Sequence, residues 1–192
     1  MFSAPAGVGM DHREQVLDAA GALFYERGIQ AVGMAEIRTA AGVSLKRLYQ
    51  CFASKDELVE SYLRRRDRRW REQLAGHVAG NPGVLSVFDW LRDWFADPGF
   101  RGCAFINSFG ELGATSDAVA RAAREHKAAL REFLLDQLTG DDREKRADQL
   151  LMLVDGAITT AAITGDPGAA DTARDAARTL ITKPPNSLSS VT

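Results

Sequence analysis

Residues 37–52 have the sequence Ile37-Arg38-Thr39-Ala40-Ala41-Gly42-Val43-Ser44-Leu45-Lys46-Arg47-Leu48-Tyr49-Gln50-Cys51-Phe52. This pattern predicts two short helices joined by a tight turn. Gly42 can adopt the positive φ that a sharp turn requires, because it lacks a Cβ atom. Ser44 is a favourable N-cap for the second helix, since its hydroxyl can accept a hydrogen bond from a free backbone N–H there. Leu48 and Phe52 are four residues apart, so both point inward from one face.

The other face of this second helix is polar and basic. Lys46, Arg47, Tyr49 and Gln50 remain outside, and Leu45 lies at the tip. A short helix with such a face fits the major groove of B-DNA. There, lysine or arginine can donate hydrogen bonds to guanine, and an apolar side chain can touch a thymine methyl group. We therefore predict that the chain binds double-stranded DNA.

Composition supports a folded chain with an uneven distribution of charge. Hydrophobic residues make up 45% of the 192 residues, which is enough for a sizeable core and excludes wholesale disorder. The net charge is −2, but residues 1–71 contain 12 basic and 9 acidic residues, which gives +3. The remaining residues contain 12 basic and 17 acidic ones, which gives −5. Only the first part therefore suits a polyanionic partner.

Several protein classes are disfavoured. Cys51 and Cys103 have no metal-ligand spacing and no disulfide framework, so reduced thiols in the cytoplasm are expected. The first ten residues lack the basic region of a signal peptide, and no apolar run approaches the ~20 residues of a membrane span. The sequence contains no phosphate-binding loop, metal-ligand cluster or nucleophile elbow. We therefore expect no enzyme activity, no cofactor, no metal and no membrane association.

Apolar residues recur at helical spacing along most of the chain. Three short helices are expected within residues 11–54, and about six longer ones within residues 55–182. A capping-box pattern at residues 54–57 starts a long helix that bridges the two parts. No strand pattern is evident, so we predict an all-α protein of about nine helices, with an N-terminal helix-turn-helix domain and a C-terminal helical domain. Residues 1–10 and 183–192 are expected to be flexible.

A position-specific set of residues runs from position 11 to about 60: Ala19-Ala20, Leu23-Phe24, Gly28, Ile37, Ala41-Gly42-Val43-Ser44, Leu48-Tyr49, Phe52 and Ser54-Lys55-Asp56-Glu57-Leu58. This part of the chain resembles the TetR family of transcriptional regulators. The resemblance implies a homodimeric repressor in which two helix-turn-helix heads bind a palindromic operator. It also implies that a small-molecule effector in the C-terminal domain moves the bridging helix, changes the separation of the heads and releases the DNA.

The resemblance also guides the assignment of DNA contacts. Tyr49 and Lys55 match phosphate-contact positions of the family, and Lys55 begins a helix, where anions bind favourably. Lys46 stands where the family frequently has Gly, which adds a cation. A solvated basic face is the alternative interpretation of this surface. The complete set of predicted DNA-binding residues is Arg38, Thr39, Ser44, Leu45, Lys46, Arg47, Tyr49, Gln50 and Lys55.

An effector site is predicted in the C-terminal part, where aromatic residues are concentrated. Aromatic walls with a few polar groups are typical of small-molecule sites, although ordinary core packing explains the same residues. His126 has the alternative role of a hydrogen-bonded core residue. Asp155 lies among apolar neighbours, so it is expected to pair with an arginine or to bind a polar or cationic effector. The predicted lining residues are Trp70, Phe88, Trp90, Trp94, Phe105, Asn107, Phe109, His126, Met152, Asp155 and Thr159.

The last two helices are the predicted dimer interface. Residues 156–163 and the final helix, at about 170–181, are rich in small residues, which allow helices to approach closely. Packing inside one chain is the alternative interpretation. The function predicted from these features is repression relieved by an effector. A DNA-binding regulator that responds to a protein partner, or that acts as an activator, is the alternative function.

Six arginines between Arg64 and Arg71 form a further basic run. Successive residues of a helix are about 100° apart, so these side chains spread around the helix and form no single stripe. We expect a solvated and partly paired face, with Glu60–Arg64 and Asp67–Arg71 as i,i+4 pairs, and no second DNA-binding patch.

Overall fold

The computed structural model describes residues 11–182, so the two tails expected to be flexible lie outside the described residues. Nine α-helices and no strand occur within this range, which confirms the all-α prediction. No helix there combines the length and the apolarity that crossing a bilayer demands. The helices are α1 His12–Arg27, α2 Met34–Ala41, α3 Leu45–Cys51, α4 Lys55–Gly80, α5 Ser86–Phe95, α6 Ala104–Leu112, α7 Asp117–Asp136, α8 Arg143–Thr164 and α9 Ala169–Thr182.

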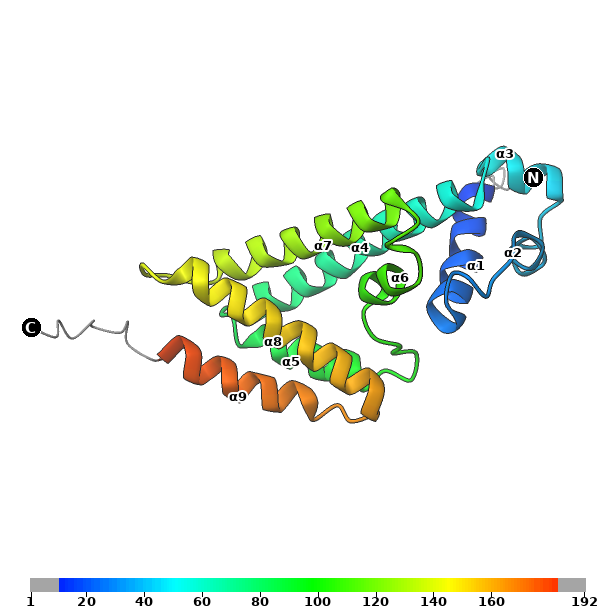
Figure 1. Ribbon diagram of the computed structural model, residues 1–192. Helices are drawn as coiled ribbons and strands as arrows, with labels where there is room; N and C mark the ends of the chain where they lie inside the picture. Colours follow the sequence, from blue (N-terminus) through cyan, green and yellow to red (C-terminus); the bar gives the residue numbers. More distant parts are fainter. Residues whose placement is uncertain (1–10, 183–192) are drawn as a thin grey trace, which may run out of the picture.

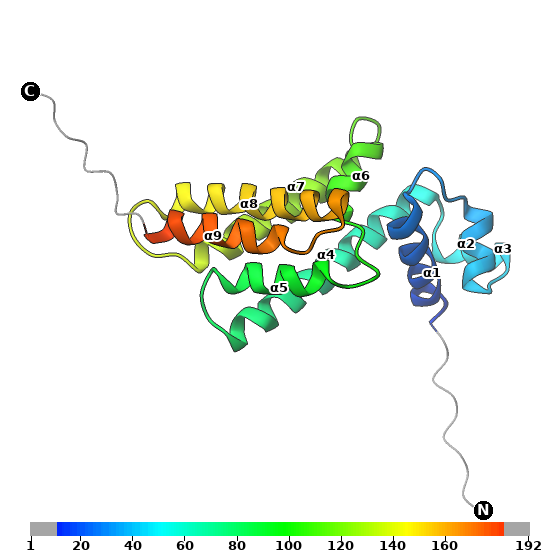
Figure 2. The ribbon, with the colours of Figure 1, turned by 90° about the horizontal axis from the view of Figure 1, so that it is seen from below.

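The helices form a small head and a larger body. Helices α1–α3 make the head at one end of the molecule, and α4 runs from the head along the body (Figures 1 and 2). In the body, α4 packs against α5 and α7, while α8 packs against α7, α9 and α5. Helix α6 lies between the head and the rest of the body (Figure 1) and packs on α7. The head therefore projects from the body, and α4 is the element they share.

The predicted turn between α2 and α3 is present. Gly42 has φ 64° and ψ 26°, the left-handed conformation that glycine adopts without strain. The backbone N–H of Val43 donates to the carbonyl of Arg38 at 3.3 Å, which closes the end of α2. The hydroxyl of Ser44 accepts from the N–H of Arg47 at 3.1 Å and caps α3.

The predicted capping box at the start of α4 is also present. The hydroxyl of Ser54 accepts from the N–H of Glu57 at 3.1 Å. The carboxylate of Glu57 reaches back one residue beyond the cap and accepts from the N–H of Ala53 at 2.8 Å. These reciprocal bonds satisfy backbone donors that a helix start leaves free. From this cap, α4 continues without interruption for 26 residues.

The core of the head includes side chains from α4. Ile37, Leu48 and Phe52 have no exposed surface, and neither has Leu58 of α4. Nearby, the rings of Phe24 and Tyr62 meet edge to face, with their centroids 5.5 Å apart. The first turns of α4 therefore cover apolar surface that α1–α3 cannot bury among themselves.

The arginine run of α4 differs in part from the expectation. The Glu60–Arg64 and Asp67–Arg71 pairs form as predicted, each with an N–O distance of 2.8 Å. The prediction of a solvated face is wrong for Arg65, whose side chain is only 10% exposed. It lies 2.8 Å from Glu14 and 2.9 Å from Asp18, because α1 crosses this side of α4.

We predict that replacing Arg65 with methionine destabilises the protein by about 1–3 kcal/mol, because two carboxylates on α1 lose a charged hydrogen-bond partner that is largely shielded from water. The free energy of unfolding in urea measures this change. Arg68→Met is the matched control on an exposed face of the same helix and should change stability by less than about 0.5 kcal/mol. Equal effects of the two substitutions would contradict the assignment.

Candidate nucleic-acid interface and effector site

The outer face of α3 is open to solvent. Leu48 is fully buried, so it anchors the inner face of this short helix. Figures 1 and 2 show α3 at the end of the molecule away from the body, where no other helix covers it. The exposed side chains of α3 are Leu45, Lys46, Arg47, Tyr49 and Gln50. All five predicted contacts on α3 thus lie on its accessible side, as a helix that enters a DNA groove requires.

Three other predicted contacts make bonds within the head. Ser44 caps α3, so its hydroxyl already has one partner. The hydroxyl of Thr39 donates to the carbonyl of Ala35 at 3.0 Å, and Arg38 donates to that hydroxyl at 3.2 Å. Arg38 and Thr39 are exposed, and they lie on α2 just before the turn. Their placement leaves Arg38 with further N–H groups for a phosphate oxygen.

Lys55 makes contacts within the head that were not predicted from the sequence. Its ammonium donates to the carbonyl of Ile29 at 2.6 Å and lies 6.0 Å from the centre of the Phe24 ring. The side chain is half-buried. An ammonium has three N–H groups, so a phosphate contact stays compatible with this bond. Lys55 thus also connects the start of α4 with the loop after α1.

Arg13 is a positioning residue that sequence reasoning missed. Its guanidinium donates to the carbonyl of Cys51 at 2.6 Å and to the hydroxyl of Ser61 at 3.2 Å. It also lies 4.1 Å from the centre of the Phe52 ring. These contacts fix the end of α3 against α1 and α4. They join residues 38 and 48 positions apart, so no local pattern could have revealed them.

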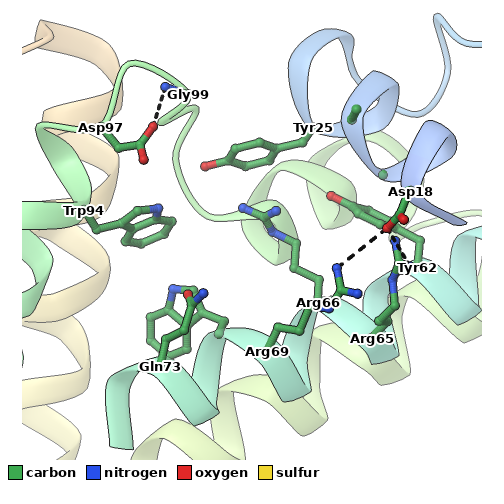
Figure 3. Close-up of a pocket in the computed structure, with 13 residues that line it drawn as sticks. Asp18, Tyr25, Tyr62, Arg65, Arg66, Arg69, Gln73, Trp94, Asp97 and Gly99 are labelled. Carbon is green, nitrogen blue, oxygen red and sulfur yellow. Dashed lines mark hydrogen bonds and ion pairs between the residues drawn. The ribbon is translucent and has the colours of Figure 1, made fainter. Parts of the chain in front are cut away.

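The predicted effector residues do not line a single cavity. Trp70 and Trp94 line a hollow of about 410 Å³ between α1, α4 and the segment after α5 (Figure 3). Phe105 and His126 line a second hollow of about 340 Å³ between α4 and α7. Inward-facing positions could be predicted from helical spacing, but helical spacing does not determine which helices meet.

The other predicted effector residues are scattered. Asn107 lines a hollow of about 340 Å³ beside α1, and Met152 lines a groove of about 380 Å³ between α8 and α9. The remaining five line none of these four hollows: Phe88 is fully buried, Trp90 is half-buried against Trp70, Asp155 is paired, and Phe109 and Thr159 are exposed. The predicted effector residues are therefore distributed over several hollows of the described residues.

The comparisons with known proteins agree with this architecture. The model of the family "Bacterial regulatory proteins, tetR family" matches residues 16–62, from α1 into α4. The structure of SCO4454, a TetR-family transcriptional regulator from Streptomyces coelicolor, is similar over 88% of this chain and 94% of that chain, with 30% sequence identity and a TM-score of 0.81. The chain belongs to the TetR family.

Two further relatives match over less than a third of this chain. The HTH-type transcriptional repressor KstR2 of Mycobacterium tuberculosis is 41% identical over 59 residues, which cover 31% of this chain and 30% of that protein. The HTH-type transcriptional activator FasR of Mycolicibacterium smegmatis is 49% identical over 55 residues, which cover 29% of this chain and 25% of that protein. This TetR-family chain is a DNA-binding transcriptional regulator, in a family of transcription factors and not of enzymes.

In this TetR-family protein the head is fastened to the body by a carboxylate. Glu111, at the end of α6, accepts from the backbone N–H of Ile29 at 3.1 Å and of Gln30 at 2.8 Å. The side-chain amide of Gln30 donates in return to the carbonyl of Glu111 at 2.6 Å. Gly28 permits this approach: it has φ 86°, and a Cβ there would lie 3.0 Å from a Glu111 oxygen. These hydrogen bonds therefore hold the loop after α1 against the end of α6.

Tyr25 forms a second link between the head and the body. Its hydroxyl donates to the carbonyl of Gly102 and accepts from the N–H of Arg101, both at 2.9 Å. Burial raises the pKa of Tyr25, although the hydrogen bond from Arg101 opposes this, so the phenol remains a donor at neutral pH. These two hydrogen bonds therefore connect α1 to the segment before α6.

A buried polar cluster lies at the centre of the body. The His126 side chain is 3% exposed, its Nδ1 lies 2.7 Å from Asp67, and its ring stacks on Phe105 with centroids 3.8 Å apart. Lys127 lies 3.8 Å from the sulfur of Cys103 and pairs at 2.5 Å with Asp155, so Asp155 meets a lysine and not the expected arginine.

Mutual hydrogen bonds set the protonation of this cluster. Burial is the largest single influence and alone would lower the pKa of His126 and raise that of Asp67, but several contacts together outweigh it: hydrogen bonds to Asp67 and Cys103 for His126, and hydrogen bonds to His126 and Arg71, with their charges, for Asp67. The pKa of His126 is therefore raised and that of Asp67 is lowered. Burial would likewise raise the pKa of Cys103, but hydrogen bonding to His126 and the charge of Lys127 hold it below its usual value. His126 is therefore a core residue whose buried imidazole has hydrogen-bond partners within the protein.

We predict that Asp67→Asn costs more stability at about pH 6 than at about pH 9, by about 1 kcal/mol. A histidine whose pKa is raised by folding stabilises the fold below its unfolded pKa of ~6.5 and loses that contribution as the pH rises through its folded pKa. Asp67 stays ionised over this range because its pKa is lowered. Urea unfolding at both pH values measures the difference.

Glu60→Gln is the control for this measurement, because Glu60 pairs with arginines that keep their charge over the range. Its cost should be the same at both pH values. An Asp67→Asn cost that stays constant, or grows toward pH 9, would show that His126 is not the partner that matters.

Proposed function

We propose that this regulator is a homodimeric repressor, acting in the cytoplasm, that inserts α3 of each protomer into the major groove of a palindromic operator. The outer face of α3 carries the proposal, since it presents Lys46 and Arg47 on a helix that Ser44 caps and Leu48 anchors. Two cations on a rigid, exposed helix can donate to guanine edges and phosphates. A two-fold dimer suits a site with two-fold symmetry.

We expect Lys46→Ala and Lys55→Ala to weaken DNA binding in different ways. Lys46 faces outward at the start of α3, so its loss should relax operator preference by about 1–3 kcal/mol. Lys55 lies beside the backbone of the loop after α1, so its loss should weaken binding about equally on all sequences and reduce the salt slope by about 1. Binding isotherms on selected and scrambled duplexes at several salt concentrations separate the two effects.

Lys145→Ala is the control for these isotherms, because Lys145 is an exposed lysine on α8, far along the chain from the head. It should leave both affinity and preference unchanged. If all three variants bound every duplex as the parent protein does, the proposed role of α3 would be refuted.

The outer surface of α8 and α9 supports the proposed dimer interface. Met152 and Ile163 of α8 are 72% and 79% exposed, which is unusual for side chains of this size and apolarity. A groove of about 380 Å³ separates α8 from α9 and is lined by small side chains, among them Ala157 and Ala173. Small side chains let a second copy of these helices approach closely, and burial of the two large apolar side chains would stabilise the pair.

We predict that the double substitution Met152→Glu with Ile163→Glu converts the protein to a monomer and lowers operator affinity by more than about tenfold, because one head then binds alone. Sedimentation equilibrium and binding isotherms measure the two effects. Phe109→Glu, which changes a 49% exposed apolar residue on α6, is the control and should leave the dimer intact. A double variant that stays dimeric would place the interface elsewhere.

Control by a small molecule follows from the links between head and body. Glu111 and Tyr25 join the loop after α1, and α1 itself, to the ends of α6. A ligand that moves α6 or α4 would therefore displace the head and change the separation of the two α3 helices. KstR2 and FasR both match part of this chain while their names give opposite signs, so repression is proposed from the family and not from α3.

A further inference from the structure

The largest of the four hollows described above lies where the head meets the body. It has a volume of about 410 Å³ and is bordered by α1, α4 and the segment between α5 and α6 (Figure 3). Small-molecule sites commonly have volumes of about 300–1,000 Å³. Aromatic side chains form part of its walls: Tyr25 and Tyr62 on the head side, and Trp70 and Trp94 on the body side.

Three arginines border this hollow, and they differ in their partners. Arg65 and Arg69 turn toward Asp18, at 2.9 Å and 3.8 Å (Figure 3). Arg66 points instead into the hollow, where its guanidinium lies 3.7 Å from the centre of the Tyr25 ring. Among residues 11–182, Arg66 has neither an ion pair nor a hydrogen bond, although its side chain is half-buried. A cation withdrawn from water without an acceptor favours an anionic ligand.

The other polar groups around the hollow also favour an anionic ligand. Gln73 and Trp94 border the hollow across from Asp18 (Figure 3), and neither side chain makes a hydrogen bond within the described residues. Their amide and indole N–H groups are free to donate. The opposing charge is Asp97, whose carboxylate accepts from the N–H of Gly99 at 2.6 Å. Asp97 keeps its second oxygen free, but the three arginines outnumber Asp18 and Asp97, so the lining of the hollow carries a net formal charge of +1.

We propose that this hollow binds an aromatic carboxylate, with the carboxylate on Arg66 and the ring between the aromatic walls of Tyr25 and Trp94. Guanidinium and carboxylate match in bidentate geometry, and a flat apolar group suits the faces of these rings. The Tyr25 ring also bears the hydroxyl that joins the head to Gly102. A ligand here touches the head and the body together, so the proposal rests on the proposed function for its regulatory consequence.

Calorimetric titration of the full-length protein tests the site without DNA. The probes are benzoate, phenylacetate and 3-phenylpropanoate, each paired with its neutral amide. We expect at least one carboxylate to bind with a Kd below about 10 mM, and its amide to have a Kd at least about tenfold higher. Arg66→Gln should weaken the carboxylate at least about tenfold. Arg68→Gln, which removes an exposed arginine outside this hollow, should change it less than about twofold.

The site is overturned if no carboxylate of the series binds, if acid and amide bind equally, or if Arg66→Gln binds as well as the parent protein. Circular dichroism and thermal unfolding of Arg66→Gln confirm that its fold is intact. Operator affinity with and without the bound carboxylate is then measured separately. Binding that depends on Arg66 but leaves operator affinity unchanged supports the site and contradicts effector control in the proposed function.

Discussion

The head cannot bury its own core without α4. Helices α1–α3 span about 40 residues, and domains of that size rarely stabilise themselves by apolar burial alone. Here Leu58 and Leu63 of α4 are fully buried, and Tyr62 meets Phe24 across the boundary. Arg65 adds a shielded ion pair to α1 one turn further along. The first three turns of α4 therefore help to stabilise the head. The remaining turns of α4 pack on α5 and α7. A tilt of α4 would consequently also shift the head.

What the sequence predicted well is what neighbours along the chain determine. The turn at Gly42, the cap at Ser44 and the capping box at residues 54–57 each depend on groups within four residues, and each is present. The exposed face of α3 follows from helical periodicity and from the burial of Leu48. These features produce the exposed basic face of α3, and they explain why that face could be predicted from the sequence.

The features that could not be predicted from the sequence depend on contacts between residues far apart along the chain. Arg13 reaches Ser61, and Glu111 reaches Gln30, across 48 and 81 positions. No pattern in one sequence links such pairs. The distribution of the predicted effector residues over several hollows has the same origin: each prediction of an inward position was local, whereas a cavity is defined by several helices together. His126 and Asp155 also show that a polar residue on an apolar face often has a partner from another helix, here Asp67 and Lys127.

The Glu111 contact has a consequence for exchanging parts between regulators. The N–H groups of Ile29 and Gln30 belong to the head, but the carboxylate that accepts from them comes from α6 of the body. A chimaera that joins this head to the body of another regulator keeps the turn and the helix caps within the head, but it loses the hydrogen bonds to Glu111. Unless the recipient presents an acidic side chain at the same position, the two backbone donors of the transplanted head lose their acceptor, and the chimaera lacks this link between its two parts.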